Sequence, residues 1–174
     1  MVTGGPSALA ELMPDEPEVH GLLALMLIND ARRDARFADD TVILLRDQDR
    51  SLWNREQIAE GIAFVEAALR SRPPGPYAVQ AAIAAVHAEA ADAAATDWRQ
   101  IAALYSVLLR LQPTAVIELN HAVAVAMADG PEHGLRILDR LEAREELASY
   151  HLFRVARAEL LLRLGREAEA MQEY

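Results

Sequence analysis

The chain has 174 residues, of which 52% are hydrophobic, and its 27 acidic residues outnumber its 17 basic ones to give a net charge of −10. This length and apolar content predict a folded chain with a substantial core rather than a disordered one. The negative charge would repel a phosphate backbone, so we expect no direct contact with nucleic acid. Cysteine is absent, which excludes disulfides, thiolate metal sites and thiol nucleophiles.

No segment has the features of a membrane span or a secretion signal. The longest apolar run, residues 21–28, is far shorter than the roughly 20 residues that a bilayer span needs. Residues 1–13 lack a basic region followed by an apolar one, and they are expected to be a flexible leader. These patterns predict a cytoplasmic protein that does not contact a membrane.

Residues 14–95 are expected to form a helical N-terminal half. A first helix should run from Pro17 to about Ala35 and be deeply buried, and a second should begin after Asn54, which has Gln57 at capping-box spacing. A third, rich in alanine, should begin near Tyr77. Apolar residues at helical spacing mark their buried faces: Val19, Leu22, Leu23, Met26 and Leu27 in the first; Ile58, Ile62, Val65 and Leu69 in the second; Val79, Ile83 and Val86 in the third.

Residues 37–53 interrupt the helical pattern and are expected to form one ordered irregular loop with a short extended piece. The end of this loop places polar residues beside a large aromatic side chain, and two interpretations are open. In the structural one, Arg50 pairs with a neighbouring aspartate and Trp53 anchors the loop in the core. In the functional one, the segment contacts a partner protein through Asp47, Gln48, Asp49, Arg50 and Trp53.

Residues 96–174 are expected to form tetratricopeptide-like repeats. Thr96 is the predicted cap of the first helix, and glycines at 130 and 165, spaced 35 residues apart, should mark turns between helices. After the second turn, Ala170 and Tyr174 occupy the small and aromatic positions of such a repeat, whose last copy would be truncated. The fold prediction is therefore all-α, a right-handed array of antiparallel helix pairs.

The sequence contains no motif for catalysis, and we expect no enzyme activity, cofactor or metal. The five histidines lack metal-ligand spacing, and no nucleotide-binding or nucleophile motif is present. His87, Glu89 and Asp92 form the densest local group of candidate ligands. We expect these three to be solvated polar groups at a helix end.

Five phrases, in order, resemble the carboxy-terminal helical extension of a group of bacterial extracytoplasmic-function sigma factors. Two departures are His121 after Asn120, where the family more often has Arg, and Leu52, where a basic residue is frequent. The phrases are DQDRSLWN (47–54), GPYAVQAAIAAVHAEA (75–90), TDWRQIAALYSVLLRLQP (96–113), ELNHAVAVAM (118–127) and YHLFRVARAELLLRLGR (150–166).

The resemblance implies a regulatory module in transcription initiation. Such an extension would contact the factor's own sigma regions or RNA polymerase, and its loop residues 47–50 and Trp53 would take part in the docking. A free-standing repeat scaffold that binds a peptide or protein is the alternative. Homodimerisation through an exposed C-terminal end bearing Leu160, Leu161 and Leu164 also remains open.

Overall fold

The protein's computed structural model describes residues 13, 15–38, 41–144, 147 and 150–173. Its described part is built of helices and one pair of two-residue strands, which confirms the predicted all-α class. The chain divides into two compact units, residues 1–97 and 98–174. The predicted leader, residues 1–13, lies outside the described residues apart from Met13, as does Tyr174.

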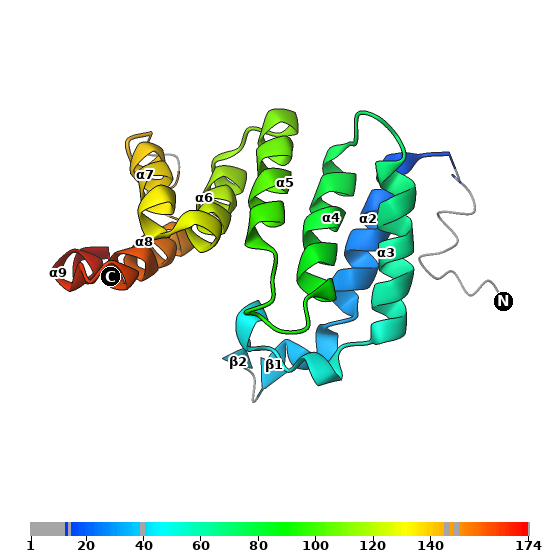
Figure 1. Ribbon diagram of the computed structural model, residues 1–174, viewed down its shortest axis with the longest axis horizontal. Coiled ribbons are helices and arrows are strands. Elements are labelled where there is room, and N and C mark those ends of the chain that lie inside the picture. Colours follow the sequence, from blue (N-terminus) through cyan, green and yellow to red (C-terminus); the bar gives the residue numbers. More distant parts are fainter. Residues whose placement is uncertain (1–12, 14, 39–40, 145–146, 148–149, 174) are drawn as a thin grey trace. The chain divides into compact units, whose positions relative to one another are not determined.

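The first unit contains three long helices, α2 (Pro17–Asp30), α3 (Arg55–Leu69) and α4 (Pro76–Glu89). Helix α2 packs against both others, and Figure 1 shows α2 and α4 running in one direction and α3 in the opposite one. Small residues permit the close approach of α2 to α4, because a Cβ at Gly21 would lie 2.5 Å from the main-chain nitrogen of Ala78. The Glu18 carboxylate accepts the N–H groups of Tyr77 and Ala78 at 2.9 and 3.1 Å, which caps the start of α4.

The end of the first helix and its buried face both differ from the prediction. Helix α2 ends at Asp30, and a separate 3₁₀ helix, η1 (Arg33–Ala35), follows it. Leu22 and Met26 are 38% and 52% exposed, while Ala24 and Ile28 are buried. Leu23 and Leu27 are buried as predicted. The buried face also includes Gly21, because α3 and α4 pack closely against α2 where its side chains are small.

Helix starts were predicted more accurately where a side chain caps them. The Asn54 Oδ1 atom accepts the N–H of Gln57 at 3.0 Å, which confirms the predicted cap of α3. In the second unit, α5 (Trp98–Leu111) begins directly after Asp97, so Thr96 lies one residue outside the cap position and is buried instead. Such one-residue differences are common at helix ends.

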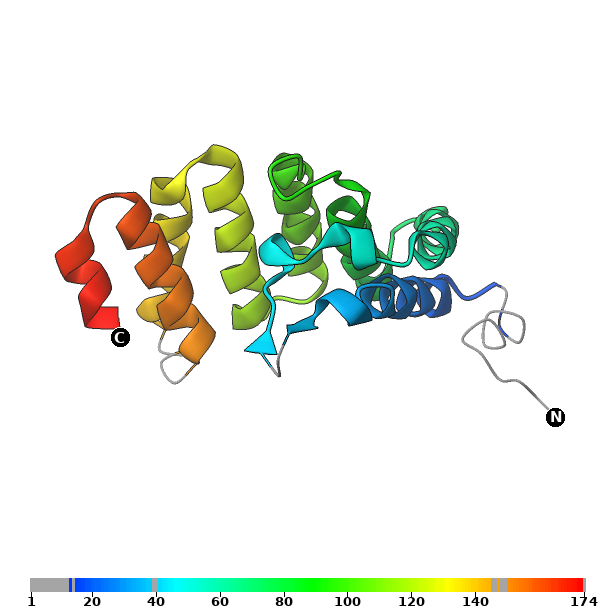
Figure 2. The same ribbon diagram turned by 90° about the horizontal axis from the view of Figure 1, so that it is seen from below.

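The second unit is a succession of helices, α5, α6 (Ala115–Asp129), α7 (Pro131–Glu142), α8 (His151–Arg163) and α9 (Glu167–Ala170), with a final 3₁₀ helix, η4 (Met171–Glu173). Each α-helix packs against the next one, as Figure 2 shows. The turns fall at the predicted glycines, both of which have positive φ: +112° at Gly130 and +71° at Gly165. Helix-by-helix packing is a property of tetratricopeptide-type arrays, and the repeat register itself stays a prediction.

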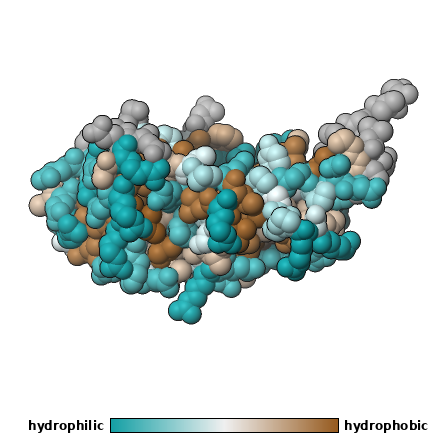
Figure 3. All heavy atoms as spheres, turned by 90° about the horizontal axis from the view of Figure 1, so that it is seen from above, coloured by the Kyte–Doolittle hydropathy of each residue, from teal (hydrophilic) through white to brown (hydrophobic). Residues whose placement is uncertain are grey.

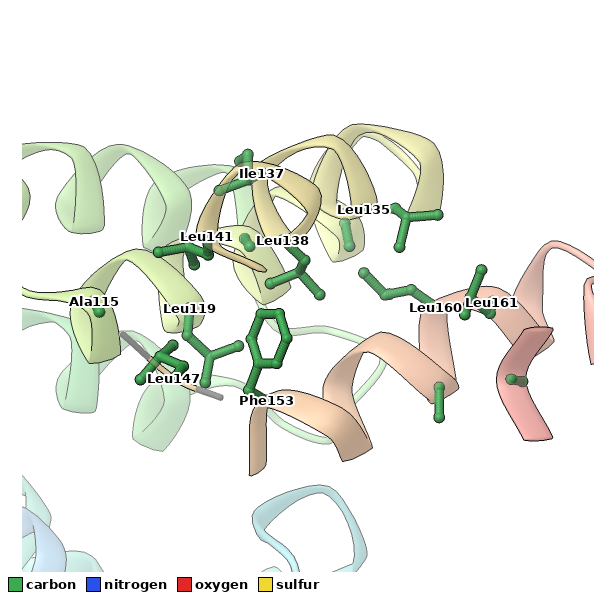
Figure 4. Packing of buried hydrophobic residues seen from close by; sticks show 14 residues of the cluster. Ala115, Leu119, Leu135, Ile137, Leu138, Leu141, Leu147, Phe153, Leu160 and Leu161 are labelled. Atoms are coloured by element: carbon green, nitrogen blue, oxygen red, sulfur yellow. The ribbon is translucent and has the colours of Figure 1, made fainter. Parts of the chain in front are cut away.

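One apolar cluster joins α6, α7, α8 and α9. Figure 4 shows Phe153 of α8 pointing toward Leu138 of α7, and both side chains are 1% or less exposed. Leu160 and Leu161 belong to the same cluster and are 4% and 0% exposed, so the expectation that they form an exposed dimer surface is wrong. The short helix α9 packs on α8 and brings the buried Ala170 into this cluster.

The described helices include none that is both long enough and apolar enough to cross a membrane. On the face drawn in Figure 3, hydrophilic side chains predominate and apolar atoms are visible between them. Apolar surface scattered in this way is normal for folded proteins and indicates no particular site.

Candidate partner-contact loop

The candidate site is the segment between α2 and α3, which is ordered by main-chain hydrogen bonds. Strand β1 (Phe37–Ala38) pairs antiparallel with β2 (Thr41–Val42), with Phe37 opposite Val42. The N–H of Ile43 donates to the Arg36 carbonyl at 2.7 Å, which extends this pairing toward α2. Two 3₁₀ helices, η2 (Leu45–Asp47) and η3 (Arg50–Leu52), complete the loop, and the Asn54 N–H donates to the Ala31 carbonyl at 2.9 Å.

Trp53 anchors the loop from inside, as the structural interpretation expected. Its side chain is only 3% exposed. Three guanidinium groups surround its ring: the Cζ atom of Arg50 lies 4.4 Å from the ring centroid, and those of Arg32 and Arg55 each lie 5.8 Å away. Cation–π contacts of this kind are worth more when they are partly desolvated. Guanidinium groups from the turn after α2, from η3 and from α3 therefore lie around one indole.

Arg50 does not pair with Asp47 or Asp49, which corrects the expectation drawn from the sequence. Its Nη1 atom donates to the carbonyls of His87 and Ala90 at 2.8 and 2.9 Å. These carbonyls belong to the C-terminal end of α4, where main-chain oxygens lack helical partners and a cation is favourable. Arg50 thus connects the loop to a helix end that lies 37 residues or more further along the chain.

The other three predicted site residues differ in exposure. Asp49 accepts the Ser51 N–H at 2.9 Å and so caps η3. A hydrogen bond with the Ser51 side chain, followed by this main-chain one, lowers the pKa of the Asp49 carboxyl group. Gln48 is half-buried and donates to the Ile43 carbonyl at 3.1 Å. Asp47 is exposed, and its Oδ2 atom lies 3.6 Å from the Nε atom of Arg46. The five predicted residues are therefore neighbours in the chain, but Trp53 is buried, Arg50 and Gln48 are half-buried, and Asp47 and Asp49 are exposed.

Exposed apolar side chains on the loop were missed by the sequence analysis. Phe37, Val42, Leu44 and Leu52 are 61%, 65%, 56% and 51% exposed. Phe37 and Val42 are cross-strand partners, so their side chains share one face of the strand pair. We call these four exposed residues the apolar loop face, of which the strand pairing places Phe37 and Val42 side by side. The run of apolar residues from Val42 to Leu45 was its only signal in the sequence, and such a run does not tell which side chains are buried.

His87 is half-buried beside this loop, which corrects the expectation of a solvated helix end. Burial, followed by the guanidinium charges of Arg32 and Arg50, lowers the pKa of His87 from 6.5 to about 4. The imidazole is therefore neutral near pH 7. Among the residues that the structure describes, no three histidine or acidic side chains come together as a metal-binding group.

These features define a class of helical protein in which an irregular loop, held from inside by tryptophan and arginine, presents apolar side chains outward. Residues 6–69, which include α2, the whole loop and all of α3, match the model of a family of unknown function (DUF6596). The chain is also 48% identical over 167 residues to an uncharacterized protein of Rhizobium meliloti (strain 1021). That match covers 95% of this chain but only 39% of the relative, so the chain spans about two fifths of the relative's length. No solved structure matches the chain.

Proposed function

We propose that this chain is the regulatory, protein-binding part of an extracytoplasmic-function sigma factor and acts in transcription initiation in the cytoplasm. Its partner would be the factor's own sigma regions or RNA polymerase. The proposal is supported by the five sequence phrases that resemble such extensions and by a relative whose sequence extends well beyond the region similar to this chain. The acidic charge fits a role through protein contacts rather than through DNA.

The observation that carries the proposal is the contrast between the two sides of the loop. Trp53 and Arg50 fix its inner side, whereas the apolar loop face is more than half exposed at each of its four residues. Exposing a group of large apolar side chains on an ordered segment is unfavourable unless they contact another molecule. An ordered loop also loses little conformational entropy on binding, so its contacts contribute to affinity.

The test is titration calorimetry of the chain with the separately expressed two-region sigma core of the same organism. A Leu44→Ser/Leu52→Ser double variant should bind about 10- to 100-fold more weakly. Full burial of a leucine contributes about 1.5–3 kcal/mol, and only the exposed half of each side chain remains to be buried on binding. Leu152→Ser, at a 55% exposed leucine of α8 in the second unit, is the matched control and should bind like the unchanged chain.

Each outcome has a defined meaning. Equal binding by the loop variant and the control would exclude the apolar loop face as the contact. A second titration uses core RNA polymerase. If the unchanged, folded chain binds neither the sigma core nor the polymerase, the proposed function is overturned. Binding to the polymerase alone would identify the partner within the proposal.

A further inference from the structure

Four arginines of the first unit form a continuous group around Trp53. We call Arg32, Arg36, Arg50 and Arg55 the arginine cluster. Three of their guanidinium carbons lie within 5.8 Å of the indole centroid, and Arg36 is near enough to Arg32 for their charges to interact. Since like charges at such distances repel, an isolated grouping of this kind costs free energy in the folded chain.

The arginine cluster lacks carboxylate partners within the described part of the chain. Its side-chain hydrogen bonds go to neutral acceptors: Arg50 to two main-chain carbonyls of α4, Arg55 to the Arg50 carbonyl at 3.3 Å, and Arg32 to the Asn29 side chain. Burial is the largest cause that lowers the pKa of the Arg32 and Arg50 guanidinium groups. The charges of Arg36 and Arg50 lower that of Arg32 further, and the charge of Arg55 lowers that of Arg50, where Asp92 acts in the opposite direction.

In the second unit, by contrast, several arginines form ion pairs with glutamates. Arg144 pairs with Glu118 at 2.7 Å, Arg154 with Glu142 at 2.9 Å, and Arg166 with Glu169 at 2.6 Å. The chain has ten more acidic than basic residues, so carboxylates are plentiful, yet the arginine cluster pairs with none among the described residues. The cluster is therefore not a by-product of a basic sequence.

The centre of the arginine cluster also contains buried hydrogen-bond donors that lack acceptors among the described residues. The Nε atom of Arg32 and the Nε1 atom of Trp53 are buried and have no hydrogen-bond acceptor among the described residues. Buried donors normally find acceptors, because an unmade hydrogen bond leaves a desolvation cost uncompensated. These two donors are enclosed by the protein, so an incoming anion would contact the exposed Arg36 and Arg55, where the unbalanced positive charge favours it.

We propose that the arginine cluster binds carboxylate side chains of an acidic segment of the partner protein, which rests on the protein-binding function proposed above. Guanidinium groups match carboxylates in geometry and form strong, charge-assisted hydrogen bonds with them. Leu52 follows Arg50 within the same short helix and is half exposed, so a segment with acidic and apolar side chains finds both kinds of contact. A nucleic acid is disfavoured by the overall negative charge.

A direct test uses acetylated hexaglutamate, which needs no knowledge of the partner. Nuclear magnetic resonance of the ¹⁵N-labelled chain would follow the arginine Nε–H signals and the Trp53 indole signal, assigned with Arg→Gln variants and with Trp98→Phe. Hexaglutamate should shift the signals of Arg36, Arg55 and Trp53, whereas hexaglutamine should leave them unchanged. If millimolar hexaglutamate does not shift these signals, the proposal is overturned. It is also overturned if inorganic phosphate shifts the same signals at a lower concentration than hexaglutamate does.

A second test uses the sigma core and separates this inference from the proposed function. Arg36→Gln and Arg55→Gln should each weaken binding to the sigma core roughly tenfold, as expected for the loss of one charge-assisted hydrogen bond. Arg33→Gln is the matched control, because Arg33 is exposed like Arg36 and Arg55, but its Nη1 atom lies 3.6 Å from the Asp30 carboxylate. Tight binding that none of the three variants changes would overturn the arginine inference and leave the proposed function standing. If the chain binds hexaglutamate but not the sigma core, the arginine inference stands and the sigma core is excluded as the partner.

Discussion

The guanidinium of Arg50 stacks over the indole of Trp53 with 4.4 Å between its Cζ atom and the ring centroid, while its Nη1 atom binds two carbonyls at the end of α4. One side chain therefore joins the loop, the core tryptophan and a distant helix end. The first prediction concerns this side chain. Arg50→Ala should lower the free energy of unfolding by about 1–3 kcal/mol, because it removes a cation–π contact and leaves helix carbonyls without a donor.

Urea denaturation followed by circular dichroism measures this change. Arg50→Lys should recover only part of the loss, since an ammonium group cannot stack as a planar guanidinium does. Arg33→Ala, at an exposed arginine, is the control and should change stability by less than about 0.5 kcal/mol. An Arg50→Ala chain as stable as the unchanged one would show that this connection contributes nothing to folding.

The second prediction concerns the contact between α2 and α4. Gly21→Ala places a methyl group 2.5 Å from the Ala78 main-chain nitrogen, so the two helices must separate. We expect a loss of about 2 kcal/mol or more, even though alanine favours helix over glycine by roughly 1 kcal/mol. Met26→Ala, on the exposed side of α2, is the comparison and should have little effect. Increased stability of Gly21→Ala in thermal denaturation would contradict the close packing.

The third prediction concerns pH. The unfolded chain takes up a proton on His87 near its ordinary pKa of 6.5, whereas the folded chain does so only near pH 4. Stability should therefore fall as the pH decreases from about 6.5 to about 4, with His87 contributing up to about 3 kcal/mol to the loss. Urea titrations at pH 7 and pH 5 should show a smaller difference for His87→Gln than for the unchanged chain. A His87 pKa near 6.5, measured from its ring proton shifts, would refute this prediction.

The fourth prediction concerns the core of the second unit. Phe153→Ala should cost about 3–5 kcal/mol, because the side chain is 1% exposed and fills the space shown in Figure 4. Leu152→Ala changes the preceding residue, which is 55% exposed, and should cost far less. If calorimetric unfolding gave the two variants the same melting temperature, the assignment of Phe153 to the core would be wrong.

Local features of the fold were predictable from the sequence. The Asn54 cap and the turn at Gly130 depend on residues within a few positions of each other, and the structure has both where the sequence placed them. The buried face of α2 was not predictable in the same way. Which residues of α2 are buried depends on where α3 and α4 pack against it. A prediction from side-chain size alone wrongly buries Leu22 and Met26.

The candidate site was predictable only as a segment. The burial of Trp53 followed from its size, but the partners of Arg50 lie 37 and 40 residues away in the chain, and nothing in the local sequence points to them. The neutral state of His87 has the same origin, because the burial and the two arginines that lower its pKa come from tertiary packing. Contacts between distant segments therefore decided what each predicted residue does.

The loop is tied to its helices at two points, through the Asn54 N–H on the Ala31 carbonyl and through Arg50 on the α4 carbonyls. Motions of the loop and of these helix ends are consequently coupled. A molecule that holds the loop also slows opening of the last turn of α4, so the amides of that turn should exchange with deuterium more slowly when the loop is occupied. Occupancy of residues 37–53 can thus be followed by mass spectrometry at peptides some forty residues away in the chain.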